Sequence, residues 1–305
     1  MQGKRVLVTG GAGFIGSNLA NHLAKHNEVV AIDDGYLGVE ENLDEAVEFH
    51  ERSVLEDDLP TDVDAVFHLA ALSSYAMHEE NPTEGARVNV EGFVNTVEQA
   101  RNDGCDTVVY ATTSSIYGSR TEPSPEDMDV EARTGYEASK LARERYAEYF
   151  AHHYDMHMAG MRFFSVYQGY GGAEEHKGEF ANIIAQFADD IANGESPKIY
   201  GDGSQTRDFT YITDIVNGLE LAADNELTGV YNLGTGESYD FNTVVEYINE
   251  ELGTDVEPVY VENPIPENVY VHDTKADVTK FTAATDWKPS ISFEEGVSRV
   301  CEQYE

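Results

Sequence analysis

The chain has 305 residues, 41% of them hydrophobic, and its 58 acidic and 19 basic residues give a net charge of −39. A chain of this length can bury a large core, while its charge excludes nucleic acid and anionic membranes as partners. Every apolar run is shorter than the ~18 residues that a membrane span needs, and a strand pattern begins directly after the N-terminus, so we expect a cytoplasmic protein.

The acidic residues are scattered along the whole chain. We interpret them as a surface adapted to molar intracellular salt, which shrinks the Debye length to ~3 Å and removes self-repulsion. Cation binding and mimicry of nucleic acid are the alternatives. The two cysteines, Cys105 and Cys301, lack the spacing of a zinc site or a disulfide framework. His153 and His157 stand four apart, but a strand pattern begins near His157, so no metal site is expected.

Strands and helices alternate along the first half of the chain. Apolar runs at 4–9 and 28–33 flank a segment in which Ile15, Leu19 and Leu23 recur every four residues, as on one face of a helix. Further strands are expected at 46–50, 64–70, 106–113 and 157–164, and helices near 83–103 and 135–153. This order predicts an α/β protein with a Rossmann-type doubly wound parallel sheet.

The pattern changes after residue 168. A glycine-rich polar segment comes first, then a helix near 179–193, and residues 237–305 read as helices and short strands interrupted by prolines. We therefore expect a Rossmann-type domain at 1–168, to which a segment of about 205–236 returns and which would bind a cofactor, and a smaller α/β lobe formed mainly by 169–305 that would bind the substrate.

The first predicted strand ends in TGGAGFIGS, which places Gly10, Gly13 and Gly16 at intervals of three. Glycines between a strand and a helix allow a sharp turn, close approach of the backbone to a pyrophosphate, and tight packing of helix on strand. Asp33 ends the second strand, where a carboxylate can bind the adenosine ribose hydroxyls and repel a 2′-phosphate. The pattern predicts NAD as cofactor; an FAD site or a relic nucleotide fold is the alternative.

Hydroxyl groups follow the strand at 106–113, where the ligand crevice of a doubly wound sheet lies. They belong to Thr112, Thr113, Ser114 and Ser115, and a loop that satisfies its own backbone groups would have the same composition. The next helix begins with Tyr136 and Lys140, four residues apart and hence on one face. We expect the ammonium to lower the pKa of the phenol, so that Tyr136 can accept a proton while a hydride leaves the same carbon.

Together these segments resemble the extended short-chain dehydrogenase/reductases of the nucleotide-sugar epimerase type over nearly the full chain. The motifs that carry the resemblance are TGGAGFIGS, HLAAL (68–72), VNVEGFVNTVEQA (88–100), ATTSSIYG (111–118), GYEASKL, RFFSVY (162–167), IYGDGSQTRDFTYITDI (199–215), VYNLGTG (230–236) and DWKP (286–289). The resemblance implies a UDP-sugar 4-epimerase, similar to UDP-glucose 4-epimerase, that holds NAD tightly and works through a transient 4-keto sugar. It makes Tyr136 the base, Lys140 the residue that holds the nicotinamide ribose, and Thr113, four residues before Tyr117, the partner of the sugar 4-hydroxyl.

The resemblance also implies further contacts. Cofactor-binding residues besides those named above would be Phe14, Ile15, Asp34, Leu69, Ala70, Ala71, Asn89, Thr112 and Phe164. Substrate-binding residues would be Thr113, Ser114, Ser165 and Arg207, the last gripping the nucleotide diphosphate unless it forms a surface ion pair with Asp208. Three positions depart from the family pattern: Ser53 replaces an Asp near adenine, Ser165 an Asn near the substrate, and His272 stands near the place of a second arginine.

Related dehydratases and decarboxylases carry acidic residues between the Thr and the YG motif, where this chain has Ser114 and Ser115. The resemblance therefore favours epimerisation over nucleotide-sugar decarboxylation, dehydration or reduction; a regulatory NAD-binding protein without turnover is a remote alternative. The sequence leaves the sugar series open. The family commonly forms homodimers through the helices near 83–103 and 135–153, where Phe93 and Val97 could form a buried stripe or simply pack on the sheet.

Overall fold

A computed structural model describes residues 1–304 and confirms the predicted doubly wound α/β fold. Within these residues the main sheet has seven strands, and all neighbouring strands are parallel. From edge to edge the strands are β11 (Gly229–Leu233), β6 (His157–Phe163), β5 (Thr107–Thr113), β4 (Ala65–His68), β1 (Arg5–Thr9), β2 (Glu28–Asp33) and β3 (Glu48–Glu51). The carboxyl ends of these strands meet at one edge of the sheet, where ligands bind in folds of this class.

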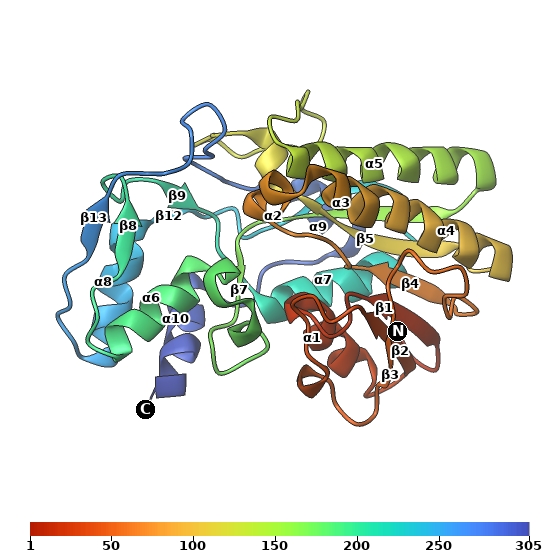
Figure 1. The fold of residues 1–305 in the computed structure, drawn as a ribbon, viewed down its shortest axis with the longest axis horizontal. Helices are drawn as coiled ribbons and strands as arrows, with labels where there is room; N and C mark the ends of the chain where they lie inside the picture. The colour runs from red at the N-terminus through yellow and green to blue at the C-terminus, as the bar shows by residue number, and fades with distance from the viewer. Residues whose placement is uncertain (305) are drawn as a thin grey trace.

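Helices cover both faces of the sheet (Figure 1). One face packs against α1 (Phe14–Leu23) and α7 (Ile212–Asp224), and the other against α4 (Gly92–Asp103) and α5 (Gly135–Tyr154). Along β1, Val6 and Val8 belong to the first hydrophobic core and Leu7 to the second. Because successive side chains of a strand point to opposite faces, a sheet covered on both sides needs uninterrupted apolar strands, which the sequence provides.

The helix expected at 83–103 is observed as three successive helical segments: α3 (Pro82–Ala86), the π-helical turn η2 (Arg87–Glu91) and α4. The short helix α2 (Tyr75–Glu80) precedes them. Phe93 and Val97 on α4 are 0% exposed and pack against the sheet. Of the two alternatives considered for these residues, the structure shows packing on the sheet.

The remaining elements gather mostly beyond the carboxyl edge of the sheet, where α6, α8, α10, β8 and β13 form one end of the molecule (Figure 1). They are β7 (Val166–Tyr167), η4 (Glu175–Phe180), α6 (Ile183–Ala192), β8 (Lys198–Tyr200), β9 (Thr206–Arg207), β10 (Thr210–Tyr211), β12 (Tyr239–Asp240), α8 (Phe241–Leu252), β13 (Val259–Val261), α9 (Thr279–Thr285) and α10 (Phe293–Cys301). Three short pairs, β10 with β7, β12 with β9 and β13 with β8, complete the strands. The division into an NAD-binding domain and a substrate lobe stays a prediction.

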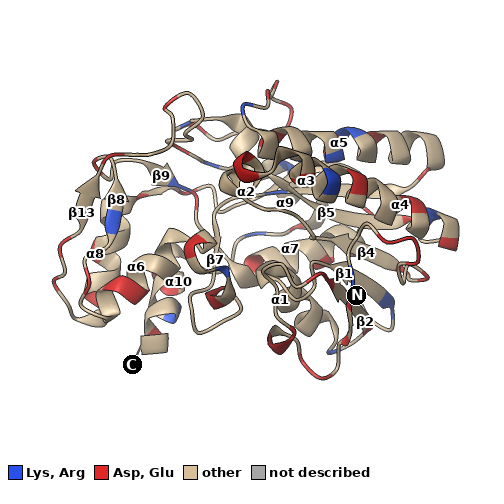
Figure 2. Cartoon of the chain, in the orientation of Figure 1, with Lys and Arg blue, Asp and Glu red and all other residues tan. Residues whose placement is uncertain are grey.

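Short 3-10 segments connect several of these elements: η1 (Glu40–Asn42), η3 (Ser114–Tyr117) and η5 (Glu302–Tyr304). Asp and Glu are distributed over helices and loops at both ends of the molecule (Figure 2). Among residues 1–304, no helix has both the length and the apolar character needed to cross a membrane.

Candidate active site

A cavity of about 400 Å³ opens at the carboxyl edge of the main sheet. Strand ends from β1, β2, β4, β5 and β6 contribute to its wall, as does the first turn of α5. Most residues that the sequence analysis singled out line it: Gly10, Gly13, Phe14, Ile15, Gly16, Asp33, Asp34, Leu69, Ala70, Ala71, Thr112, Thr113, Tyr136, Lys140 and Ser165. Tertiary structure thus brings six separate stretches of sequence to one pocket.

The glycine-rich turn forms the floor of the cavity. Gly10 has a φ of +65°, and a Cβ atom there would lie 2.7 Å from the backbone nitrogen of Ala70. A Cβ on Gly16 would overlap the Gly10 carbonyl oxygen, so any side chain would push α1 away from the strand. Gly13 is the N-cap residue of α1, and no side chain caps the helix there. The N–H groups of the first helical turn are therefore free to bind an anion. The turn fits a dinucleotide pyrophosphate.

Asp33 is the last residue of β2, and it also lines the cavity. It accepts hydrogen bonds from the backbone N–H groups of Ala12 (3.2 Å) and Gly35 (2.9 Å), which fix its orientation. Burial is the main influence on this group and raises the pKa of Asp33, opposed by those two hydrogen bonds. A fixed carboxylate here fits the ribose hydroxyls of NAD and opposes the 2′-phosphate of NADP.

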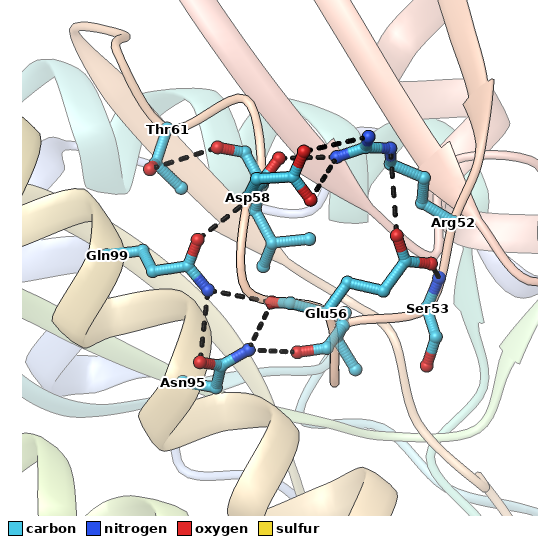
Figure 3. A network of polar contacts seen from close by, with 9 residues as sticks. Arg52, Ser53, Glu56, Asp58, Thr61, Asn95 and Gln99 are labelled. Atoms are coloured by element: carbon cyan, nitrogen blue, oxygen red, sulfur yellow. Dashed lines mark hydrogen bonds and ion pairs between the residues drawn. The ribbon is translucent and has the colours of Figure 1, made fainter.

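The loop after β3 closes the same end of the cavity, where Arg52 and Val54 line the wall. Figure 3 shows how this loop is held. The Arg52 guanidinium contacts Asp58, and the side chain of Glu56 accepts a hydrogen bond of 2.9 Å from the Ser53 backbone. From α4, Asn95 donates to the carbonyl oxygens of Val54 and Glu56 (both 2.8 Å), and Gln99 donates to that of Glu56 (2.9 Å). Ser53 thus belongs to an ordered loop, although it does not itself line the cavity.

Thr113, Tyr136 and Lys140 lie together at the junction of β5 and α5. Helix α5 begins at Gly135 because the Thr134 hydroxyl caps it, accepting a hydrogen bond of 3.1 Å from the backbone of Glu137. Tyr136 therefore stands in the first turn, and the Lys140 Nζ lies 5.7 Å from the centre of its ring. Thr113 shares a hydrogen bond of 2.9 Å with the Ser115 hydroxyl.

Burial has the largest effect on the two titratable side chains of this site. It raises the pKa of Tyr136, and the opposing influences are the Thr113 hydroxyl and the charge of Arg143. Lys140 is 2% exposed, and burial lowers the pKa of its ammonium well below its ordinary value, with Arg143 adding to the effect. That Lys140 lowers the pKa of Tyr136 stays a prediction.

Four predicted contacts do not line the cavity. Ser114 is buried in η3, and Phe164 stacks on Tyr117 with ring centres 6.1 Å apart. Asn89 is buried, accepts a hydrogen bond from the Leu72 backbone N–H (2.9 Å) and donates to its carbonyl oxygen (3.0 Å), so it holds a loop whose Leu72 does line the cavity. Their positions place these residues behind the cavity wall.

Arg207 is the fourth of these residues. Its guanidinium donates to the carbonyl oxygens of Thr206 (2.8 Å), His272 (2.7 Å) and Val271 (2.7 Å). The ion pair with Asp208 that was weighed as an alternative does not form, because the Asp208 carboxylate accepts hydrogen bonds from Thr235, Gly236 and Ala276. In this arrangement Arg207 holds the loop that carries His272, and its grip on a diphosphate stays a prediction.

The structure adds residues that sequence reasoning missed. His176 and Lys177 of η4 line the cavity from the far side, and the Lys177 Nζ lies 5.5 Å from the centre of the Phe14 ring. The only signal in the sequence was a glycine-rich polar stretch, which indicates a loop without saying what the loop covers. Only the return of this loop to the first turn of α1 places a lysine beside the glycine-rich turn.

Comparison with known proteins agrees with this geometry. The sequence model of the NAD dependent epimerase/dehydratase family matches residues 6–234. A putative UDP-glucose 4-epimerase of Methanocaldococcus jannaschii is 33% identical over 303 residues, which cover 97% of this chain and 96% of the relative. A UDP-N-acetyl-alpha-D-glucosaminuronate decarboxylase of Bacillus cytotoxicus is 31% identical over 322 residues, covering 99% and 98% of the two chains.

Among solved structures, the UDP-N-acetylglucosamine 4-epimerase of Methanobrevibacter ruminantium M1, in complex with UDP-N-acetylmuramic acid, superposes with a TM-score of 0.91. The two chains are 29% identical, and the match covers 100% of this chain and 99% of the other. The family match extends from the first strand through the glycine-rich turn and the Tyr136–Lys140 helix to the end of β11. The chain therefore belongs to the NAD dependent epimerase/dehydratase family.

Proposed function

We propose that this protein is an NAD-dependent epimerase that inverts C4 of a UDP-sugar. The observation that carries the proposal is the convergence of Thr113, Tyr136 and Lys140 on a cavity floored by a dinucleotide-binding turn. A proton acceptor beside a hydride acceptor is what oxidation of a secondary alcohol requires. The relatives named as 4-epimerases support the same assignment.

In the proposed mechanism, Thr113 orients the sugar 4-hydroxyl and Tyr136 accepts its proton. NAD, when bound, would supply reversible hydride transfer at C4, and return of the hydride to the opposite face of the 4-keto sugar would invert that carbon. Tyr136 then gives the proton back to the oxygen, so that no net oxidation occurs. The turn around Gly10, with Asp33 and Lys140, would hold the cofactor throughout, which allows one bound NAD to serve every cycle.

Epimerisation is preferred to the other reactions of this fold because of what lies next to Thr113. Ser115 fills that place and shares its hydrogen bond with the Thr113 hydroxyl at 2.9 Å. Dehydration would require a general acid that protonates the leaving hydroxyl group, and a serine hydroxyl is too weak an acid to do so at neutral pH. Decarboxylation, reduction and a regulatory role without turnover remain the competing activities, and the experiment below separates them.

We also propose that the protein works as a cytoplasmic homodimer. Support comes from the outer face of α5, where Tyr146 (43% exposed), Tyr149 (47%) and Tyr154 (38%) are uncovered aromatic side chains. Exposed aromatic groups gathered on one helix are typical of interfaces. Light scattering of the wild-type protein and of Tyr149→Asp in molar KCl tests this: a dimeric wild type and a monomeric variant are expected, whereas a monomeric wild type contradicts it.

The activity is tested by incubating the protein with UDP-glucose, UDP-N-acetylglucosamine and UDP-glucuronate in turn. Molar KCl is present, NAD is supplied and no reductant is added; the sugar products are identified by proton NMR. We expect the C4 epimer of at least one substrate, which also identifies the sugar series.

The matched controls are Tyr136→Phe, expected to give no product, and Tyr149→Phe, which removes the same hydroxyl from the surface of α5 and is expected to retain activity. A pentose or a 4-keto sugar as the accumulating product would show decarboxylation or dehydration instead. No product from any of the three substrates would contradict the proposal.

A further inference from the structure

The segment 168–182, which follows β7 and contains η4, is folded around one buried carboxylate, and we call it the Glu174 loop. Glu174 is 0% exposed and accepts hydrogen bonds from the backbone N–H groups of Gln168 (2.7 Å), Gly169 (2.9 Å) and Asn182 (2.6 Å). Because these groups lie at both ends of the segment, one side chain closes the loop. Its residues at the wall of the cavity are Ala173, His176, Lys177, Phe180 and Asn182.

The Glu174 loop is also attached to α1, the helix that begins at the glycine-rich turn. The side-chain amides of Gln168 and Asn18 exchange two hydrogen bonds of 3.0 Å each. Asn18 also donates a hydrogen bond of 2.9 Å to the carbonyl oxygen of Phe14, the first residue of α1. These contacts fix the position of the loop relative to the first turn of the helix.

Lys177 lies in η4 and is partly buried at the wall of the cavity. Its Nζ lies 5.5 Å from the centre of the Phe14 ring. Gly13 and Ile15, on either side of Phe14, line the same cavity. The Lys177 ammonium is therefore near the helix end whose N–H groups are free to bind an anion.

The Lys177 ammonium has no carboxylate partner in the described part of the chain. Lys4 is the only lysine in an ion pair among residues 1–304. Glu174 uses its carboxylate on the three backbone N–H groups, and the first turn of α1 contains no acidic residue. A lysine and a helix N-terminus, neither of them neutralised, thus face one cavity in a chain with 58 acidic residues. Both groups attract an anion.

The other two cationic side chains at the wall of the cavity have different surroundings. Arg52 pairs with Asp58 at 3.2 Å on the loop after β3. Lys140 donates a hydrogen bond of 3.4 Å to the carbonyl oxygen of Ala111 at the end of β5. Of the three, Lys177 is the one beside the start of α1.

We infer that Lys177 is a cofactor-binding residue whose ammonium binds a phosphate oxygen of the NAD pyrophosphate from the side opposite the glycine-rich turn. A lysine suits this contact because its ammonium is a compact charge with three donors. The backbone of the turn and the side chain of Lys177 would then hold the pyrophosphate from two sides. The inference concerns the cofactor and goes beyond the proposed reaction on the sugar.

The test measures how fast NAD leaves the holoenzyme. Protein carrying unlabelled NAD is mixed with excess ¹⁴C-labelled NAD in molar KCl, and the uptake of label gives the dissociation rate. In Lys177→Met this rate is expected to rise about tenfold, the usual effect of losing one hydrogen bond between charged groups. Lys177→Arg, which keeps the charge, is expected to restore a rate near that of the wild type. Lys25→Met is the matched control, since it removes an exposed lysine just beyond the other end of α1, and is expected to leave the rate unchanged.

Two further ligands identify the anion that the ammonium binds. ADP-ribose contains the same pyrophosphate without the nicotinamide ring, so the ratio of its affinity to that of NAD, measured by competition, is expected to be equal in Lys177→Met and the wild type. UDP carries the diphosphate of the proposed substrate, and its Kd for the holoenzyme, measured by calorimetry, is expected to be unchanged in Lys177→Met.

Three results would overturn the inference: an unchanged NAD dissociation rate in Lys177→Met, a loss of affinity for NAD without one for ADP-ribose, or weaker binding of UDP. These measurements need no turnover of a sugar. Absence of any epimer product would therefore reject the proposed function and leave the role of Lys177 standing, whereas unchanged NAD dissociation would reject that role alone.

Discussion

The carboxylate of Glu144 and the guanidinium of Arg162 form a buried ion pair between α5 and β6. Arg162 donates from Nη2 to Oε2 at 2.7 Å and from Nε to Oε1 at 3.0 Å, and the two side chains are 4% and 3% exposed. The Thr112 hydroxyl donates to the same carboxylate at 2.7 Å. The pair therefore anchors the strand end that carries Thr112 and Thr113.

Replacing Glu144 by Gln should destabilise the protein strongly, because it leaves the Arg162 charge buried without compensation. We expect a loss of roughly 3–5 kcal/mol in the free energy of unfolding, measured by urea denaturation in molar KCl. The exposed pair of Arg145 and Glu148 on the same helix is the control, and Glu148→Gln is expected to cost less than about 1 kcal/mol. Equal losses at the two sites would contradict the assignment.

Removal of the Tyr136 hydroxyl should separate catalysis from cofactor binding. Tyr136→Phe is expected to lower kcat at least about a hundredfold, the usual size of a general-base contribution, while bound NAD is retained because the glycine-rich turn and Asp33 are unchanged. Turnover is followed by NMR, and NAD is released by denaturation and quantified. A variant with near-normal rates, or one purified without cofactor, would rule out Tyr136 as the base.

The pH dependence of the reaction should follow the phenol. Because burial raises the pKa of Tyr136, its deprotonated form is scarce at low pH and becomes more populated as the pH rises. Activity is therefore expected to increase from pH 6 to 9, with kcat measured at constant KCl concentration. A rate that is flat or falls over this range would mean that deprotonation of Tyr136 does not limit the reaction.

Asp33 should decide between the two nicotinamide cofactors. In Asp33→Asn the hydrogen-bonding geometry toward Ala12 and Gly35 can persist, but the repulsion of a 2′-phosphate is lost. We expect the preference for NAD over NADP to fall at least about tenfold, measured as the ratio of Kd values of the apoprotein. Asp44→Asn on the exposed surface is the control, and an unchanged ratio in both variants would argue against the role of Asp33.

The net charge of −39 should make folding depend on salt. In dilute buffer the Debye length is long and acidic side chains repel one another over the whole surface, whereas molar KCl screens them within ~3 Å. We expect the Tm to rise steadily between 0.1 and 3 M KCl. A Tm independent of salt, or one that falls, would contradict the interpretation of the acidic surface.

The sequence predicted the central strands of the main sheet well because they are buried on both faces. Strands β1, β2 and β5 contain continuous apolar runs, and the order of strands and helices admits few topologies. The helix expected at 83–103 was less regular than predicted, because the π-helical turn η2 lies within it. Local signals of this kind do not show how a segment is fitted against the sheet.

The sequence alone determined the cofactor turn, the positions of Thr113, Tyr136 and Lys140, and the reaction class that they indicate, since these are set by short spacings along a strand and a helix. Only the tertiary structure decided that Lys177 lines the same cavity, and that Phe164, Asn89 and Arg207 lie outside it. The physical reason is that the surroundings and burial of a side chain near a site depend on groups brought from distant segments of the chain.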